Sequence, residues 1–285
     1  MPGHSDVTGI GPALQPHSGT NSVPQAFGDR SDGAARRLPG TTTLANLAGF
    51  APSPDGLQKG RAMSAGLRIQ LLGGFHAVRP DGAPIALGSG RLQELLAFLI
   101  LHREARQPRH RIAFLFWPDS TEPQALTNLR QLLHALRRTL PESVELVETR
   151  RRTLRWAPQA PAEVDVVALG ETLTRALEAF HTGDGEAAVR WGREAASRYR
   201  GDLLPDCYAP WIEPLRRELR ERTGAGLELL IHGLESRRDM AEAVRWARRL
   251  VEMDPLREAA HRTLIRIQAR AGEPAGALRS YRALE

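Results

Sequence analysis

The chain has 285 residues, of which 41% are hydrophobic and 25% charged, a balance typical of a folded globular protein. No uncharged apolar run is long enough for a transmembrane helix and no signal-peptide core follows the N-terminus, so a membrane or exported protein is not expected. The single cysteine, Cys207, excludes an internal disulfide and fits a reducing cytoplasm.

Basic residues are concentrated in the middle of the chain. Residues 61–160 hold 15 Lys and Arg against 8 Asp and Glu, whereas residues 1–60 hold 4 against 4 and residues 161–285 hold 20 against 21. All but one of the 39 basic residues are Arg. A basic block beside a neutral one indicates a polyanionic partner for the middle segment.

The N-terminal quarter contains little that predicts a core. Residues 1–64 are rich in Gly, Ser, Pro and Thr without sustained periodicity, so we expect a disordered tail. Alternating apolar residues and the turn RPDG predict a small antiparallel sheet of about three or four strands within residues 67–87. The glycines of LGGF (72–75) lack the lysine and spacing of a phosphate loop and favour a tight turn or bulge.

Three helices and a hairpin are expected next. Apolar residues recur at helical spacing over 90–102, over 110–117 and over 122–140. Thr121 and Gln124 predict a capping box for the third helix, and Pro141 its end. Residues 144–158 predict two short strands around an arginine tip. This order of elements over residues 66–160 is typical of a winged helix-turn-helix domain.

The third helix has two distinct faces. Its leucines are spaced 3, 4, 3 and 4 residues apart and form one stripe, while the opposite face contains no Asp or Glu. Amides pair with adenine and guanidinium groups with guanine in the major groove, and flanking arginines can hold phosphates. The leucines of the stripe are Leu126, Leu129, Leu133, Leu136 and Leu140, and the candidate DNA-binding residues are Thr127, Asn128, Arg130, Gln131, His134, Arg137 and Arg138.

The sequence of this helix alone fits a surface that reads DNA bases and a solvated basic face equally well. The hairpin tip favours DNA, because a wing reaches the backbone or minor groove beside the recognition helix. A solvated arginine loop would have the same sequence, so this alternative stays open. The candidate residues at the tip are Arg150, Arg151 and Arg152.

Residues 164–285 are expected to be almost entirely helical. The segment 240–250 aligns with 274–284 at an offset of 34 residues, the tetratricopeptide period, and 185–195 matches 240–250 at an offset of 55. We therefore expect a tetratricopeptide-like array, with a generic helical bundle as the alternative. Within the connection at 201–214, Tyr208 and Trp211 are expected to anchor the core.

No catalytic constellation is apparent. The sequence offers no pair of carboxylates, nucleophile–base set or cofactor loop, and its histidines lack metal-ligand spacing. We therefore expect no enzyme, no cofactor and no metal site.

Two groups of motifs resemble one known family. LRIQLLGGFHAV, LQELLAFLILH, FLFWPDS and TNLRQLLHALRRTL resemble the OmpR-type winged helix of antibiotic-regulatory-protein (SARP) activators. VDVVALGETL and YRGDLLPDCYAPWIEPLRRELRE resemble the bacterial transcriptional activator domain (BTAD) that follows it. The resemblance covers residues 66–285 and implies activators that bind direct-repeat DNA near promoters, often as dimers, and contact RNA polymerase. It also implies that helix 122–140 is the recognition helix and that the turn 117–119 is its structural entry.

The chain departs from the family pattern in two places. The hairpin has TRRRTLRW where the family commonly carries a Gly-Tyr pair, and the sequence ends within the last recognisable helix, so we expect a longer native protein. The sequence thus predicts a mainly α protein in which a winged helix (66–160) precedes a helical repeat domain (164–285). We expect a cytoplasmic, nucleoid-associated transcription activator that binds double-stranded DNA. Its alternatives are a tetratricopeptide-like protein–protein adaptor and the regulatory front end of a larger signalling ATPase or cyclase.

Overall fold

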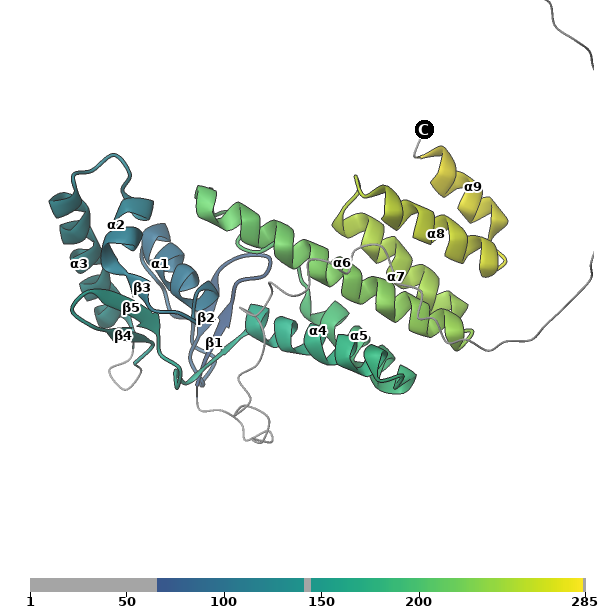
Figure 1. Cartoon of the computed structure of the whole chain (residues 1–285), viewed down its shortest axis with the longest axis horizontal. Helices are drawn as coiled ribbons and strands as arrows, with labels where there is room; N and C mark the ends of the chain where they lie inside the picture. Colours follow the sequence, from purple (N-terminus) through teal and green to yellow (C-terminus); the bar gives the residue numbers. More distant parts are fainter. Residues whose placement is uncertain (1–65, 141–144, 284–285) are drawn as a thin grey trace, which may run out of the picture. The chain divides into compact units, whose positions relative to one another are not determined.

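A computed structural model describes residues 66–140 and 145–283 of the chain. The predictions of a disordered tail at 1–64 and of a helix stop at Pro141 lie outside these residues. Within them the protein is mainly helical, with two small sheets, as the sequence predicts (Figure 1).

The winged helix contains three helices and the strands of both sheets. The sheets have the strand orders β2-β1-β6 and β3-β5-β4. The elements are β1 (Leu67–Gln70), β2 (His76–Val78), α1 (Gly90–Leu101), β3 (Gln107–Pro108), α2 (Arg109–Phe116), α3 (Glu122–Thr139), β4 (Val147–Thr149), β5 (Thr153–Trp156) and β6 (Ala162–Val164).

The first sheet is only partly antiparallel. Strands β1 and β2 pair antiparallel, as expected, across a tight turn in which Gly73 and Gly74 have φ of 78° and 141°. Only glycine adopts such backbone angles readily, which confirms the turn predicted for LGGF. The third strand, β6, comes from beyond the wing and pairs parallel with β1. Local alternation does not reveal a partner so far along the chain, so the sequence did not predict this strand.

Helix α1 is the centre of the winged helix. Every residue from Leu95 to Leu101 is buried, so other elements cover the helix on most sides. The Phe98 ring packs edge-on against Phe116 of α2, with ring centroids 5.9 Å apart. A helix that is apolar nearly all round is typical of a buried element, and α1 therefore supports both α2 and α3.

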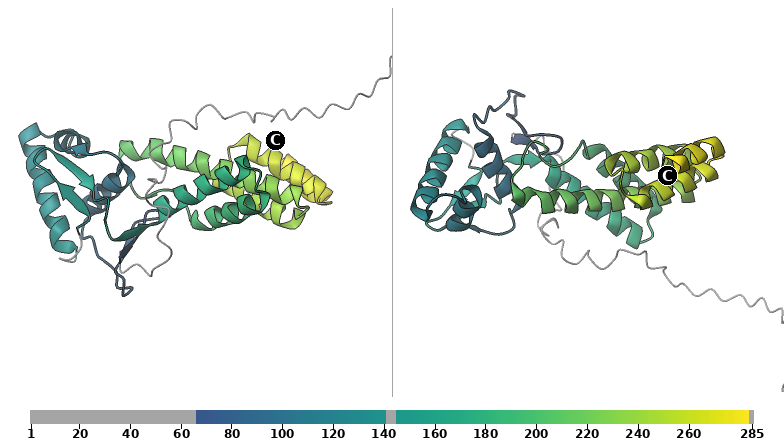
Figure 2. Two further views of the ribbon diagram at one scale, coloured as in Figure 1. Left: turned by 60° about the horizontal axis from the view of Figure 1, so that its bottom comes forward. Right: turned by 90° about the horizontal axis from the view of Figure 1, so that it is seen from above.

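The C-terminal helices pack as three consecutive pairs, α4 with α5, α6 with α7 and α8 with α9 (Figures 1 and 2). The three segments that align in the sequence begin at the first residues of α5, α7 and α9, so each starts the second helix of a pair. This regular pairing confirms the expected tetratricopeptide-like array. The helices are α4 (Asp165–His181), α5 (Gly185–Arg198), α6 (Glu213–Ser236), α7 (Met240–Met253), α8 (Glu258–Arg270) and α9 (Pro274–Arg282), with a short 3-10 turn at Pro210–Ile212.

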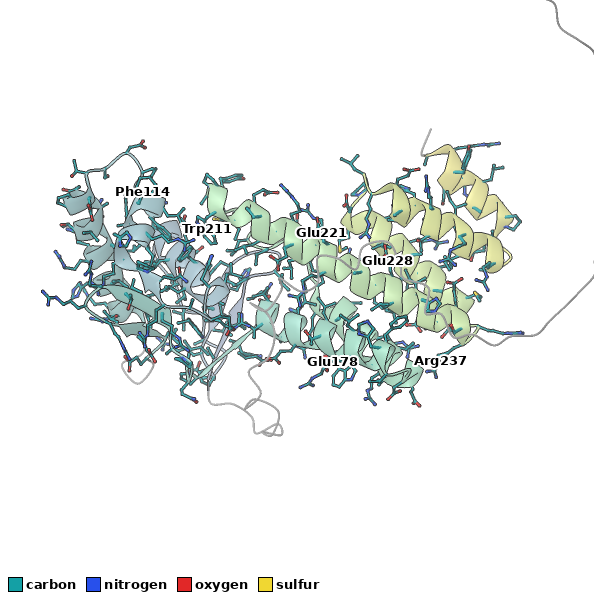
Figure 3. All side chains as sticks on the ribbon, in the orientation of Figure 1. Phe114, Glu178, Trp211, Glu221, Glu228 and Arg237 are labelled. Atoms are coloured by element: carbon teal, nitrogen blue, oxygen red, sulfur yellow. The ribbon has the colours of Figure 1, made fainter. Side chains whose placement is uncertain are left out.

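The two aromatic residues of the connection between α5 and α6 differ in burial. Trp211 is half-buried and packs against the core, as expected, at the start of α6 (Figure 3). Tyr208 is 89% exposed, so its prediction as a core anchor is wrong. The Arg216 guanidinium donates to the carbonyls of Leu203 and Cys207 and holds this connection against α6. The backbone is thus anchored by its carbonyl groups, and the Tyr208 side chain is left in solvent.

Candidate nucleic-acid interface

One face of α3 is fixed to the core. Leu129, Leu133 and Leu136 are buried, and Leu126 and Leu140 are half-buried against the same cluster, which confirms the leucine stripe. Because 3.6 residues complete a turn, this burial leaves the opposite face of α3 in solvent.

The start of α3 differs from the prediction. Thr121 is the N-cap residue, but its side chain makes no capping hydrogen bond. The Gln124 amide donates to the Asn128 side-chain oxygen at 2.9 Å instead of reaching back to Thr121. The predicted capping box is therefore wrong, because a pairing one helical turn further along the chain engages Gln124.

The candidate residues on α3 fall into two groups. Thr127 and Asn128 are half-buried, and the Thr127 hydroxyl donates to the Pro123 carbonyl at 2.9 Å. Both therefore already have a polar contact within the helix. The remaining candidates project into solvent without an intrahelical side-chain bond, and they form the central part of the face: Arg130, Gln131, His134, Arg137 and Arg138.

The wing lies beside the C-terminal half of α3. Strands β4 and β5 pair antiparallel, and Arg150, Arg151 and Arg152 are exposed at the turn between them. The Arg137 guanidinium donates to the Thr149 hydroxyl at 3.0 Å, so α3 and the wing are joined next to the turn. The structure thus brings the candidate residues of α3 and those of the wing tip together.

Arg109, the first residue of α2, belongs to this surface and was not among the sequence-predicted candidates. Its backbone N–H donates to the Arg152 carbonyl at 3.0 Å, which ties the start of α2 to the wing. Burial, followed by repulsion from Arg130 and Arg137, lowers the pKa of Arg109. Its Nε atom is buried without a hydrogen-bond partner among the described residues. An arginine at the first position of a short helix in a basic domain is the signal that could have found it.

The basic surface carries no compensating carboxylate among the described residues. Glu148, on strand β4, pairs with Arg106. By contrast, most salt bridges in residues 66–140 and 145–283 lie within the helical repeats, and none involves the arginines of α3, the wing tip or the first position of α2. The cations that stay uncompensated are Arg109, Arg130, Arg137, Arg138, Arg150, Arg151 and Arg152.

Other kinds of site find no support in the described part of the chain. No three His, Cys, Asp or Glu side chains there are placed to hold a metal ion. His102 stacks on Phe98 with ring centroids 4.2 Å apart, and burial lowers its pKa, so it belongs to the core. No described helix combines the length and apolar character needed to cross a bilayer.

Comparison with known proteins agrees with this architecture. Residues 164–285 match the model of the family described as the bacterial transcriptional activator domain. The solved structure titled Mycobacterium tuberculosis EmbR in complex with low affinity phosphopeptide has the same fold, with a TM-score of 0.65 at 20% identity, over 76% of this chain and 58% of that one. A winged helix thus precedes a segment that is similar to the bacterial transcriptional activator domain.

A curated relative is similar over both parts of the described chain. The chain is 29% identical over 225 residues to the regulatory protein AfsR of Streptomyces coelicolor. The aligned part is 76% of this chain but 22% of AfsR, so the chain spans about a fifth of that relative's length. The chain is thus similar to a bacterial transcriptional activator domain over residues 164–285 and to AfsR over a larger part of its length.

Proposed function

We propose that the winged helix binds double-stranded DNA, with α3 in the major groove and the turn 150–152 on the phosphate backbone or in the adjacent minor groove. The observation that carries this proposal is the set of arginines from α2, α3 and the wing that pair with no described carboxylate. Clustered cations that lack a protein partner suit a polyanion, because phosphates replace counterions without breaking an ion pair.

The side chains of α3 suit the reading of bases as well as the binding of phosphates. Gln131 and Arg138 lie on the exposed face, and their amide and guanidinium groups match the edges of adenine and guanine. Arg109 and the wing arginines lie at the border of this face, where they would hold phosphates and set the register. This division of roles supports sequence-specific binding by Thr127, Asn128, Arg130, Gln131, His134, Arg137 and Arg138.

The helical repeats would provide contacts with other proteins. We infer that residues 164–285 support dimer formation on direct-repeat sites and contact RNA polymerase, as the match to the bacterial transcriptional activator domain suggests. This role would place the protein in the cytoplasm, at the nucleoid.

Selection of bound duplexes from a random pool tests the function directly. The intact chain should enrich one sequence element, and two copies of that element in direct orientation should be bound more tightly than one. A chain with Gln131→Ala and Arg138→Ala should lose the enrichment but keep residual affinity at low salt. If the intact chain enriches no sequence, its basic surface is not a sequence reader, and an adaptor that docks an acidic protein becomes the better account.

A further inference from the structure

Strand β1 of the winged helix is held by residues that belong to the activator domain. Beyond its pairing with β6, its end is fixed by Asp165, the first residue of α4. The Asp165 carboxylate accepts hydrogen bonds from the backbone N–H groups of Leu71 and Leu72 at 2.9 and 3.0 Å, and from Val166 at 2.7 Å. One side chain therefore satisfies the amides of a strand end and of a helix start.

A second segment of the activator domain contacts the same strand end. The Leu204 N–H donates to the Leu71 carbonyl and the Gly73 N–H donates to the Asp202 carbonyl, each at 2.8 Å. Gly201, with φ of 154°, brings the two backbones so close that a Cβ atom there would lie 3.2 Å from the Gly73 Cα. Asp202 is held in turn by Arg220 of α6 at 2.7 Å.

The central helix of the winged helix is held from the same side. The Trp211 indole N–H donates to the Glu94 carboxylate of α1 at 3.1 Å. The Trp211 ring also packs edge-on against Phe98, with ring centroids 5.2 Å apart. Because α1 packs against α3, these contacts connect the start of α6 to the support of the recognition helix.

The buried cores do not divide where the two sequence motifs meet. One continuous cluster runs from Leu67 through the winged helix to Leu169 and Leu173 of α4 and Leu219 of α6. A second cluster contains Val189 of α5 and is otherwise built from α6 from Leu227 onwards, α7 and α8. The boundary between the cores therefore crosses α5 and α6, and in α6 it lies about sixty residues beyond the junction near residue 160.

We propose that the winged helix, α4 and the first half of α6 form one cooperative unit, in which Asp165 and Trp211 are positioning residues for the recognition helix. In this unit helix α4 is part of the DNA-binding body rather than of a separate module attached to it. The distal helices α7 to α9 form a second unit with its own stability.

Native-state hydrogen exchange of the intact chain without DNA tests the unit. Amides of α1, α3 and α4 should open together, with one opening equilibrium and one dependence on denaturant, and amides of α7 and α8 should open with a different one. The proposal is overturned if α4 opens together with α7 and α8 while α1 and α3 open separately, as a boundary near residue 160 would require.

A pair of matched variants adds a second readout. Asp165→Ala should raise the exchange rates of α1 and α4 by the same factor and leave those of α7 and α8 unchanged. Asp239→Ala, which removes the N-terminal cap of α7, should raise the rates of α7 and leave α1 unchanged. If Asp165→Ala does not fold, Trp211→Phe, which keeps a ring but removes the bond to Glu94, should show the same pattern with a smaller factor. Loosening of α4 alone by either variant would contradict the proposal.

A last experiment repeats the hydrogen-exchange measurement with random-sequence duplex DNA at low salt. Its interpretation rests on the proposed function. Bound DNA should slow exchange in α4 by the same factor as in α1, because a ligand protects the whole of the unit that it binds. Slowing in α1 without α4 overturns the cooperative unit. No slowing anywhere overturns the proposed DNA binding instead, and the DNA-free measurement then decides the unit by itself.

Discussion

At the residue scale, the candidate side chains on α3 differ in whether their polar groups already form hydrogen bonds within the helix. Gln131 and Arg138 have no polar contact within the helix, so a base edge could engage all of their donors and acceptors. The Thr127 hydroxyl and the Asn128 oxygen are already bonded, at 2.9 Å in each case. The sequence predicts that all four side chains lie on the polar side of one helix. The structure shows which of them already form hydrogen bonds within the helix.

An arginine that contacts a base and an arginine that contacts a phosphate should affect DNA binding differently. Arg138→Ala should weaken binding to the selected duplex by about 1–3 kcal/mol and narrow the difference between selected and scrambled duplexes. Arg151→Ala, at the wing tip, should weaken both duplexes by similar amounts, because a phosphate contact carries no sequence information. Fluorescence anisotropy titrations with the two duplexes measure both effects. Equal losses on both duplexes for Arg138→Ala would remove α3 from the role of sequence reader.

Arg109 provides a prediction that separates binding from stability. Arg109→Gln should weaken all duplexes about equally and leave the free energy of unfolding unchanged or slightly raised, because it removes repulsion with Arg130 and Arg137. The matched control is Arg106→Gln, which breaks the salt bridge to Glu148 and should affect DNA less. Urea unfolding and anisotropy of the same samples give the two quantities. A large loss of stability in Arg109→Gln would mean that this arginine has a structural role.

Glu242 gives a prediction for pH. Hydrogen bonding from Arg193, together with the bond from Trp246, lowers the pKa of this carboxyl from 4.5 to about 2. A folded-state pKa below the unfolded value means that the carboxylate stabilises the fold at neutral pH and that this contribution is lost as the pH falls from 4.5 towards 2. The urea midpoint of Glu242→Gln should therefore lie below that of the parent chain at pH 7, and the two should converge in acid. A difference that stays constant across this range would contradict the assignment.

At the scale of elements, the helices of the repeats depend on close approach at small residues. Gly192 of α5 faces Leu230 of α6, and a Cβ atom at Gly192 would lie 3.0 Å from the Leu230 Cβ. A Cβ atom cannot move away by a change of rotamer, so relief would require the two helices to separate. The glycine therefore sets the spacing of α5 and α6.

Two glycines of α5 give opposite predictions. Gly192→Ala should destabilise the protein by about 1–3 kcal/mol, as overpacking of a core does, despite the higher helix propensity of alanine. Gly185→Ala, at the open first position of the same helix with no atom within 4 Å, should be neutral or stabilise by up to about 1 kcal/mol. Thermal and urea unfolding of the two variants measure the contrast. Equal behaviour would show that α5 and α6 can adjust their spacing freely.

The sequence predicts these elements with unequal success for physical reasons. Helices α3 and α7 have one apolar stripe, and the periodicity of Leu129, Leu133 and Leu136 predicts both the helix α3 and its buried face. Strand β6 has three residues, and its partner lies more than ninety positions earlier, so no local pattern marks it. Hydropathy does not predict the exposure of Tyr208 either, because it gives no information on the hydrogen bonds from Arg216 to backbone carbonyls that fix the neighbouring residues.

At the scale of the whole molecule, the distribution of charge matters more than its total. The net charge of +6 is modest for 285 residues. The structure shows where the excess lacks salt bridges: many arginines of the helical repeats pair with carboxylates, as in Arg193–Glu242 and Arg266–Glu235, whereas those of α3 and the wing tip pair with no described carboxylate. The composition already placed the excess in residues 61–160. Which arginines remain uncompensated depends on pairing across elements, as in Arg106–Glu148, and required the structure.

Salt dependence tests this distribution of charge. Each phosphate neutralised by a cation releases bound counterions, so the logarithm of the binding constant should fall linearly with the logarithm of the salt concentration, with a slope of about −0.9 per neutralised phosphate. Replacing Arg150, Arg151 and Arg152 by Gln should reduce the magnitude of this slope by about 0.9 for each phosphate that is no longer neutralised. Arg262→Gln is the matched control, because Arg262 is exposed but paired with Glu258 in α8, so its removal should leave the slope unchanged. Equal slopes for the wing variant and the control would mean that the wing tip does not contact the bound phosphates, since only a cation that binds phosphate contributes to the counterion release.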